Sequence, residues 1–139
     1  MNATAQYALT PAAKAGKLVW TGRVLSGLVI AFMLFDSIIK FTMIQPVTDT
    51  FRQMGIPESL AIEIGVIGLV CTVLYAIPRT AVLGAILLTG MLGGAIASHV
   101  RIGSPLFSHV LFGVYLGLLA WGGLFLREPR LRALIPLRS

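Results

Sequence analysis

Four long apolar runs constrain this chain more than any other feature of its sequence. They cover residues 18–43, 60–77, 81–100 and 106–126, and each is near the ~20 residues that an α-helix needs to cross the hydrocarbon core of a bilayer. The composition agrees: 57% of the residues are hydrophobic, 12% are charged and the mean hydropathy is +0.91. A soluble domain has roughly 25% charged residues. The sequence therefore predicts a single-domain integral membrane protein.

Short connections predict how the four runs are arranged. "IPRT" joins the second run to the third and "RIGSP" joins the third to the fourth, and each leaves room only for an antiparallel helix hairpin. We expect an all-α membrane protein, a four-transmembrane-helix antiparallel bundle. Residues 18–126 would form its transmembrane domain, after a cytoplasmic N-terminal segment over 1–17 with no signal-peptide cleavage site. Residues 127–139 would form a basic cytoplasmic C-terminal tail.

The longest connection, "IQPVTDTFRQMGIPES", predicts a short helix of its own. Pro46 suits the first helical position and Gly55 suits the end of the helix. Val47, Phe51 and Met54 recur at helical spacing, so they would form an apolar face. We expect an amphipathic helix on the outer membrane surface between helices one and two. It either anchors the loop or acts as a movable lid.

Lysine and arginine residues are distributed unequally between the two sides of the expected bundle. Eight lie on the side of the termini and three on the other: Lys14, Lys17, Arg23, Arg79, Arg127, Arg130, Arg132 and Arg138 against Lys40, Arg52 and Arg101. By the positive-inside rule, we expect a multi-pass protein of the inner (cytoplasmic) membrane with both termini in the cytoplasm. Trp20, Tyr75 and Trp121 would then lie at the cytoplasmic interface. Basic residues confined to such connections indicate the lipid bilayer as the partner and argue against nucleic acid.

Ionisable residues inside the runs gather at the extracytoplasmic end: Asp36, Lys40, Glu63, His99, Arg101 and His109. An intramembrane charge costs at least about 2.5 kcal/mol unless it meets a partner or water. Since four separate helices place such residues at one depth, we expect them to line a shared polar pocket that binds a ligand beneath the outer surface. Asp36, Lys40, Glu63 and at least one of His99 and Arg101 would form one connected network. The apolar part of the pocket would be lined by Phe32, Phe35 and Phe112.

Simpler interpretations of these residues stay open. The i, i+4 spacing of Asp36 and Lys40 suits an ordinary intrahelical ion pair, and Glu63 suits a structural clasp as well as a ligand contact. A metal site made by the histidines with Glu63 and Asp36 is disfavoured, because no compact motif such as H-E-x-x-H is present.

Nucleophile motifs are also absent from the sequence. Ser98 and Ser108 each precede a histidine, but adjacent helical positions do not face each other, so we expect no catalytic triad. The only cysteine, Cys71, has no partner for a disulfide and is expected to be a buried, inert thiol.

Small residues spaced by four predict close helix packing. They are Gly90, Gly94 and Ser98 in the third run and Gly113 and Gly117 in the fourth, and such spacing lets two helix backbones approach. His109 continues the second series, so that face should point at protein. The partner helix belongs either to the same chain or to a second copy, and a homodimer is expected.

Three segments carry a resemblance to a known family. "GRVLSGLVIAFMLFDSIIKF", "IPESLAIEIGVIGLVCTVLYAIPRTAVLGAILLTG" and "GGAIASHVRIGSPLFSHVLFGVYLGLLAWGGLFLREPRLRALIP" together resemble the DoxX-like family of small four-helix membrane proteins. The family takes its name from a membrane subunit of a thiosulfate:quinone oxidoreductase. The resemblance therefore implies a link to membrane redox complexes, but it assigns no catalytic residue.

Two functions compete at this point. The first is a membrane protein whose outer-leaflet pocket binds a small amphipathic ligand, with a quinone or another lipid-like molecule as the first candidate. The second is an accessory or scaffold subunit of a membrane oxidoreductase or transport complex, in which the charges act as clasps between helices. Independent catalysis by Glu63 or a histidine ranks third.

Overall fold

The computed structural model describes the backbone of residues 3–134 and the side chains of residues 15–134, and this part of the chain contains helices and no strand. The elements are α1 (Ala3–Thr42), α2 (Gln45–Gln53), α3 (Leu60–Ala76), α4 (Ala81–Arg101), the π-helix η1 (Leu106–Val110), α5 (Phe112–Arg127) and α6 (Pro129–Leu134). The all-helical prediction is confirmed. The Lys14 side chain, Arg138 and residues 135–139 of the expected tail lie outside the described part.

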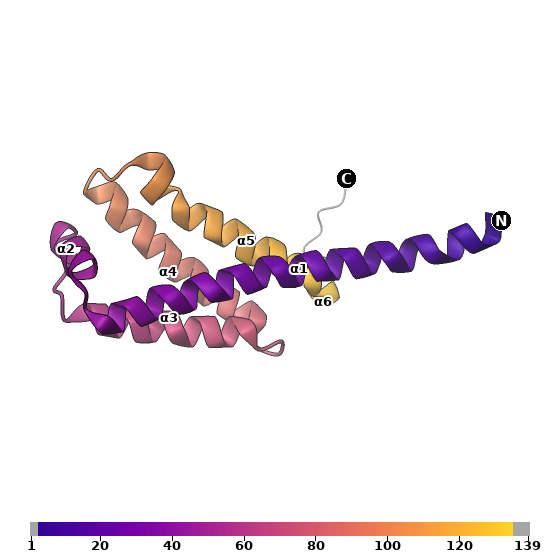
Figure 1. Cartoon of the computed structure of the whole chain (residues 1–139), viewed down its shortest axis with the longest axis horizontal. Coiled ribbons are helices and arrows are strands. Elements are labelled where there is room, and N and C mark those ends of the chain that lie inside the picture. Colours follow the sequence, from indigo (N-terminus) through magenta and orange to yellow (C-terminus); the bar gives the residue numbers. More distant parts are fainter. Residues whose placement is uncertain (1–2, 135–139) are drawn as a thin grey trace.

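The long helices form a ring in which α1 contacts α3 and α5, and α4 contacts the same two helices. Figure 1 shows successive long helices running in alternate directions, with α1 extending beyond the others toward its N-terminus. There is no break in α1 at residue 18, because the helix is continuous from Ala3. The expected separate N-terminal segment is thus helical over its described residues.

Three helical segments are long and apolar enough to cross a membrane. They are Ala15–Thr42 within α1, Ala81–Arg101, and Leu106–Arg127, which joins η1 to α5. Helix α3 is apolar too, but it has only 17 residues. The chain is a membrane protein with several apolar helices, and the four-span arrangement stays a prediction.

Glycines bring the backbones of neighbouring helices together at the end of the ring away from α2. A Cβ atom on Gly22 of α1 would lie 2.7 Å from both the Arg127 nitrogen and the Gly123 oxygen of α5. One on Gly84 of α4 would meet the backbone nitrogen and Cα of Tyr75 in α3. Only glycine permits such approaches, since real Cβ atoms need more than 3 Å.

Tyr75 joins three helices in the same region. Its hydroxyl donates to the Ala120 carbonyl of α5 at 2.7 Å, so Ser26 of α1, 2.9 Å away, must donate to the tyrosine oxygen. Arg127 donates to the Tyr75 carbonyl at 2.9 Å, and its guanidinium carbon lies 5.1 Å from the centre of the tyrosine ring. These bonds satisfy polar groups that water does not reach.

Tyr75 lies at the end of α3, as expected, but its ring cannot contact the headgroup layer, because its exposed fraction is 0%. Its hydroxyl finds partners inside the bundle, which removes the need for the headgroup layer that draws tyrosines to interfaces. Trp20 differs, with 66% of its surface exposed. Trp121 is half-buried and donates its indole N–H to Thr89 of α4 at 2.8 Å.

The evenly spaced small residues mostly do not pack within the chain. A Cβ on Gly113 would lie 2.7 Å from Ile96 of α4, so this glycine does allow close packing of α4 and α5. At Gly90, Gly94 and Gly117 a Cβ would meet nothing within 4 Å. Close contact at those three positions would need a second copy or another molecule.

Helix η1 changes the register of the fourth run. Pro105 precedes it, and the amides of Val110 and Leu111 donate five residues back, to the carbonyls of Pro105 and Leu106 at 3.2 and 2.8 Å. Such a wide π turn interrupts the regular α-helical register before α5 begins. His109 is exposed, but its ring packs against His99 of α4, as Gly113 packs against Ile96 of the same helix, so both positions of the expected stripe face protein, whereas a Cβ at Gly117 would meet nothing within 4 Å.

Replacement of Gly84 tests the backbone contact between α3 and α4. We expect Gly84→Ala to destabilise the protein by about 1–3 kcal/mol, because the added methyl group meets the Tyr75 backbone, which cannot move aside alone. Gly27→Ala is the matched control, since a Cβ at Gly27 meets nothing within 4 Å. Thermal unfolding of the purified protein in detergent measures both. Equal melting temperatures for the two variants would contradict the contact.

Candidate ligand-binding cavity

A cavity of about 750 Å³ lies inside the ring of helices at the end where α2 is found. Figure 1 shows α4 and α5 diverging from α1 and α3 toward this end. All four long helices and α2 contribute to its wall, and its apolar part is lined chiefly by Phe32, Met33, Cys71, Met91, Leu92, Phe112 and Leu116. The cavity thus lies beyond the backbone contacts of Gly22 and Gly84, on the side of the bundle where α4 and α5 move away from α1 and α3.

Asp36 and Lys40 form an ion pair on the α1 wall of this cavity. The Lys40 ammonium pairs with the Asp36 carboxylate and lies 3.4 Å from the Asp36 carbonyl oxygen. The two side chains are only 14% and 30% exposed, lysine first. The intrahelical ion pair is therefore what the structure shows. Because the two charges cancel, the pair adds polarity to the cavity without adding net charge.

Two histidines face each other across the α4–η1 connection and also line the cavity. The rings of His99 and His109 meet edge to face with their centres 5.6 Å apart. His99 Nδ1 lies 3.0 Å from the Ser104 hydroxyl, and His109 Nδ1 lies 2.7 Å from that of Ser108. Within residues 15–134, neither Nε2 atom has a hydrogen-bond partner. Each is available to a ligand as a donor or an acceptor, according to its tautomer.

The contact of Ser108 with His109 corrects the expectation that these neighbours do not face each other. They meet within the π turn of η1. Among the described side chains, no carboxylate forms a hydrogen bond with His109 to orient its ring, so Ser108 and His109 do not belong to a catalytic triad. The same part of the chain also contains no group of three His, Cys, Asp or Glu residues arranged to hold a metal ion.

Helix α2 covers the polar end of the cavity, and it is the short helix that the sequence predicts between the first two long ones. Pro46 occupies its first turn, Gly55 follows it with a φ of +66°, and Phe51 and Met54 are 6% and 8% exposed and line the cavity. A positive φ of this kind favours glycine. Arg101, at the end of α4, donates to the Met54 carbonyl. The amphipathic helix is confirmed, with its apolar face turned to the cavity.

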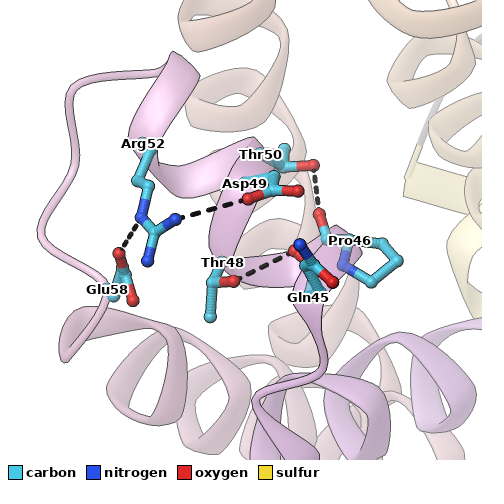
Figure 2. Close-up of polar contacts among 7 residues, drawn as sticks. All are labelled: Gln45, Pro46, Thr48, Asp49, Thr50, Arg52 and Glu58. Carbon is cyan, nitrogen blue, oxygen red and sulfur yellow. Dashed lines mark hydrogen bonds and ion pairs between the residues drawn. The ribbon is translucent and has the colours of Figure 1, made fainter.

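An ion pair also joins α2 to the segment that leads into α3. Figure 2 shows Arg52 between Glu58, to which it donates a hydrogen bond, and Asp49, whose carboxylate is 3.5 Å away. The hydrogen bond to Glu58 is the largest cause that raises the pKa of Arg52 above its ordinary value. Inside α2, the hydroxyls of Thr48 and Thr50 donate to backbone carbonyls of the preceding turn.

The predicted single network that included Glu63 is wrong. Glu63 is exposed, lies outside the cavity wall and forms no ion pair with a described residue, although the next residue, Ile64, does line the cavity. Arg101 is engaged with the Met54 carbonyl and is also absent from the wall. The position of Glu63 along the helix axis does not fix the direction of its side chain. Successive residues of an α-helix point about 100° apart, so a shift of one position decides whether a side chain faces the cavity or the outside.

The apolar residues are partly as expected. Phe32 and Phe112 line the cavity and meet edge to face with ring centres 4.9 Å apart, whereas Phe35 is 61% exposed and faces away. Cys71 is buried, as predicted, with 4% of its surface exposed, and it also lines the cavity. Sequence reasoning missed the glycines of α4 as wall residues, because their spacing indicated helix packing.

Removal of Asp36 and of Glu63 should have opposite consequences for stability. Asp36→Ala leaves the mostly buried Lys40 ammonium unpaired and is expected to cost roughly 1–3 kcal/mol. Glu63→Ala removes an exposed, unpaired group and should stay within about 0.5 kcal/mol of the wild type. Denaturation of the purified protein in detergent measures both. The double variant Asp36→Ala/Lys40→Met should regain stability, and a larger loss for Glu63→Ala would contradict this structure of the site.

Comparison with known proteins places the chain in a family. The sequence profile of the DoxX-like family matches residues 24–123, a range that contains every residue lining the cavity. Searches of curated proteins and of solved structures each gave no match. The matched range runs from α1 to the last turns of α5 and covers most of the 139 residues. The chain belongs to the DoxX-like family.

Proposed function

We propose that this chain is a four-span inner-membrane protein whose cavity binds a small amphipathic molecule. The cavity itself carries the proposal: its volume of about 750 Å³ falls within the roughly 300–1,000 Å³ of small-molecule sites. Like such sites, it combines a mostly apolar wall with a few polar groups, here concentrated toward the end near α2. An amphipathic ligand matches both parts.

The polar part of the ligand would lie near the Nε2 atoms of His99 and His109 and the Asp36–Lys40 pair. Its apolar body would contact side chains such as Phe32 and Leu116 deeper in the cavity. A quinone or another lipid-like molecule is the first candidate, as the family resemblance suggests. Glu63 and Arg101 are left out of the proposed contacts, because neither contributes to the wall.

The proposed membrane arrangement places the cavity under the outer surface. Three segments have the length of a span, and the 17 residues of α3 measure about 25 Å at 1.5 Å per residue, near the lower limit for crossing. Both termini would then be cytoplasmic, with α2 outside.

We also propose that the chain forms a homodimer. The positions of Gly117 and Gly122 on α5 support this, because a Cβ at either would meet nothing within 4 Å and another helix could approach closely. The competing function is an accessory subunit of a membrane redox or transport complex, in which a different protein covers the apolar outer faces.

Mass spectrometry of the protein purified with its native lipids tests the ligand. The wild type should retain a small molecule in a fixed ratio, and His99→Ala/His109→Ala should lose it, because both proposed head-group contacts are gone. Glu63→Gln is the matched control at the same end of the bundle and should retain the molecule. If the wild type carries a stoichiometric protein partner and no small molecule, the accessory function is correct instead. The same masses report the oligomeric state.

Topology reporters test the orientation that the distribution of basic residues predicts. A reporter fused after Ser139 should be active in the cytoplasm, and one inserted near Asp49 in α2 should be active outside. The physical reason is that short loops rich in lysine and arginine are retained on the cytoplasmic side. The opposite pattern would move the cavity to the cytoplasmic leaflet and overturn the arrangement.

A further inference from the structure

The end of the cavity nearest the polar groups is covered by α2. Phe51 and Met54 project into the wall and are almost fully buried. Arg101 holds the end of α2 through the Met54 carbonyl, and Arg52 pairs with Glu58 just before α3. A ligand that arrived from the water outside would have to displace both apolar side chains and these polar contacts. The cover therefore opposes direct entry from water.

Two sides of the cavity are closed by side chains in contact. Between α1 and α5, the rings of Phe32 and Phe112 meet with their centres 4.9 Å apart. Between α4 and α5, Ile96 lies against Gly113 so closely that an added Cβ would be 2.7 Å from its Cγ1 atom. At these two contacts there is no room for the body of an amphipathic molecule.

The side between α3 and α4 differs, because the side chain that crosses it at Gly68 is the flexible end of Met91, whose Cε atom would be 2.9 Å from an added Cβ. Ile67 of α3 and Ile86 of α4 line the cavity, and yet they are 55% and 54% exposed on the outer surface. Gly90 and Gly94 also line it, and a Cβ at either would meet nothing within 4 Å. The same cavity reaches the buried Cys71. The space is thus continuous from the core to an outer face that is apolar and, in a membrane protein, meets lipid.

We propose that the cavity opens sideways to the bilayer between α3 and α4, and that its occupant is an amphiphile taken from the lipid phase. This inference rests on the proposed function, and it adds that the ligand enters from the side and is dissolved in the lipid phase before it binds. The rim contains only apolar side chains and glycines, so an apolar chain passes it without desolvation cost, whereas a hydrated ion does not. The polar head then reaches Asp36, Lys40 and the histidines from inside the cavity.

Cys71 provides the test, because it is the only cysteine of the chain and lines the cavity. The full-length protein in lipid vesicles is treated with a long-chain N-alkyl maleimide or with sulfonatoethyl methanethiosulfonate, which is charged and stays in water, and the rate of Cys71 modification is measured in each case. The maleimide should modify Cys71 and the sulfonated reagent should not. If the sulfonated reagent reacts as fast, or if the maleimide modifies only the denatured chain, the lateral opening does not exist.

Substitutions on one face of α4 locate the opening. Gly90→Phe should slow the maleimide reaction on the order of tenfold, as a blocked gate does. Gly93→Phe is the matched control, since Gly93 is equally free of neighbours but does not line the cavity. Ile67→Ala trims an exposed side chain at the rim and should speed the reaction. Equal rates in the wild type, Gly90→Phe and Ile67→Ala would overturn the proposal, whether or not Gly90→Phe folds normally.

This experiment and the ligand measurement fail independently. Modification of Cys71 needs no bound ligand, so a lateral opening can be shown in a protein that retains no small molecule. Conversely, a retained molecule with a reaction rate unaffected by Gly90→Phe would keep the binding function and reject the route.

Discussion

Contact between helix backbones at one end of the bundle determines the shape of the whole molecule. Gly22 lets α1 approach the backbone of α5, and Gly84 lets α4 approach α3 at Tyr75. The Tyr75 hydroxyl then binds Ser26 and Ala120, so the three helices cannot separate there without leaving buried polar groups unsatisfied. Beyond this region the helices diverge, and the cavity occupies the space between them.

The diverging end is stabilised by polar contacts that leave little charge to a ligand. Asp36 and Lys40 neutralise each other, and Arg101 holds the Met54 carbonyl of α2. The histidines use their Nδ1 atoms on serine hydroxyls. An ionised ligand would find no unpaired opposite charge among these groups, whereas a neutral hydrogen-bonding head group would find two imidazole nitrogens. The chemistry of the cavity therefore suits a molecule that is itself resident in the membrane.

Sequence patterns predicted those contacts of the candidate site that depend on helical periodicity and on the position of a residue along its helix. Both members of the Asp36–Lys40 pair lie on one helix, so their contact depends only on local geometry. His99 and His109 meet because the connection between their helices is short. Glu63 lies at the expected depth but faces outward, and that direction depends on how α3 is rotated against its neighbours. A helix that is apolar on all sides has no hydrophobic periodicity, so its sequence does not predict which side faces the neighbouring helices.

Local sequence predicts the number, length and order of the apolar helices and the amphipathic helix between the first two long ones. The reason is that the length of an apolar run and the residues at its turns are properties of residues close together in the chain. Only the tertiary structure decided that Tyr75 is buried, that Gly90 and Gly94 line a cavity and that Glu63 does not. Each of these depends on a contact with a helix distant in sequence. Apolar helices bury similar side chains in almost any rotation, so close packing at a few glycines and the hydrogen bonds of one tyrosine select the arrangement.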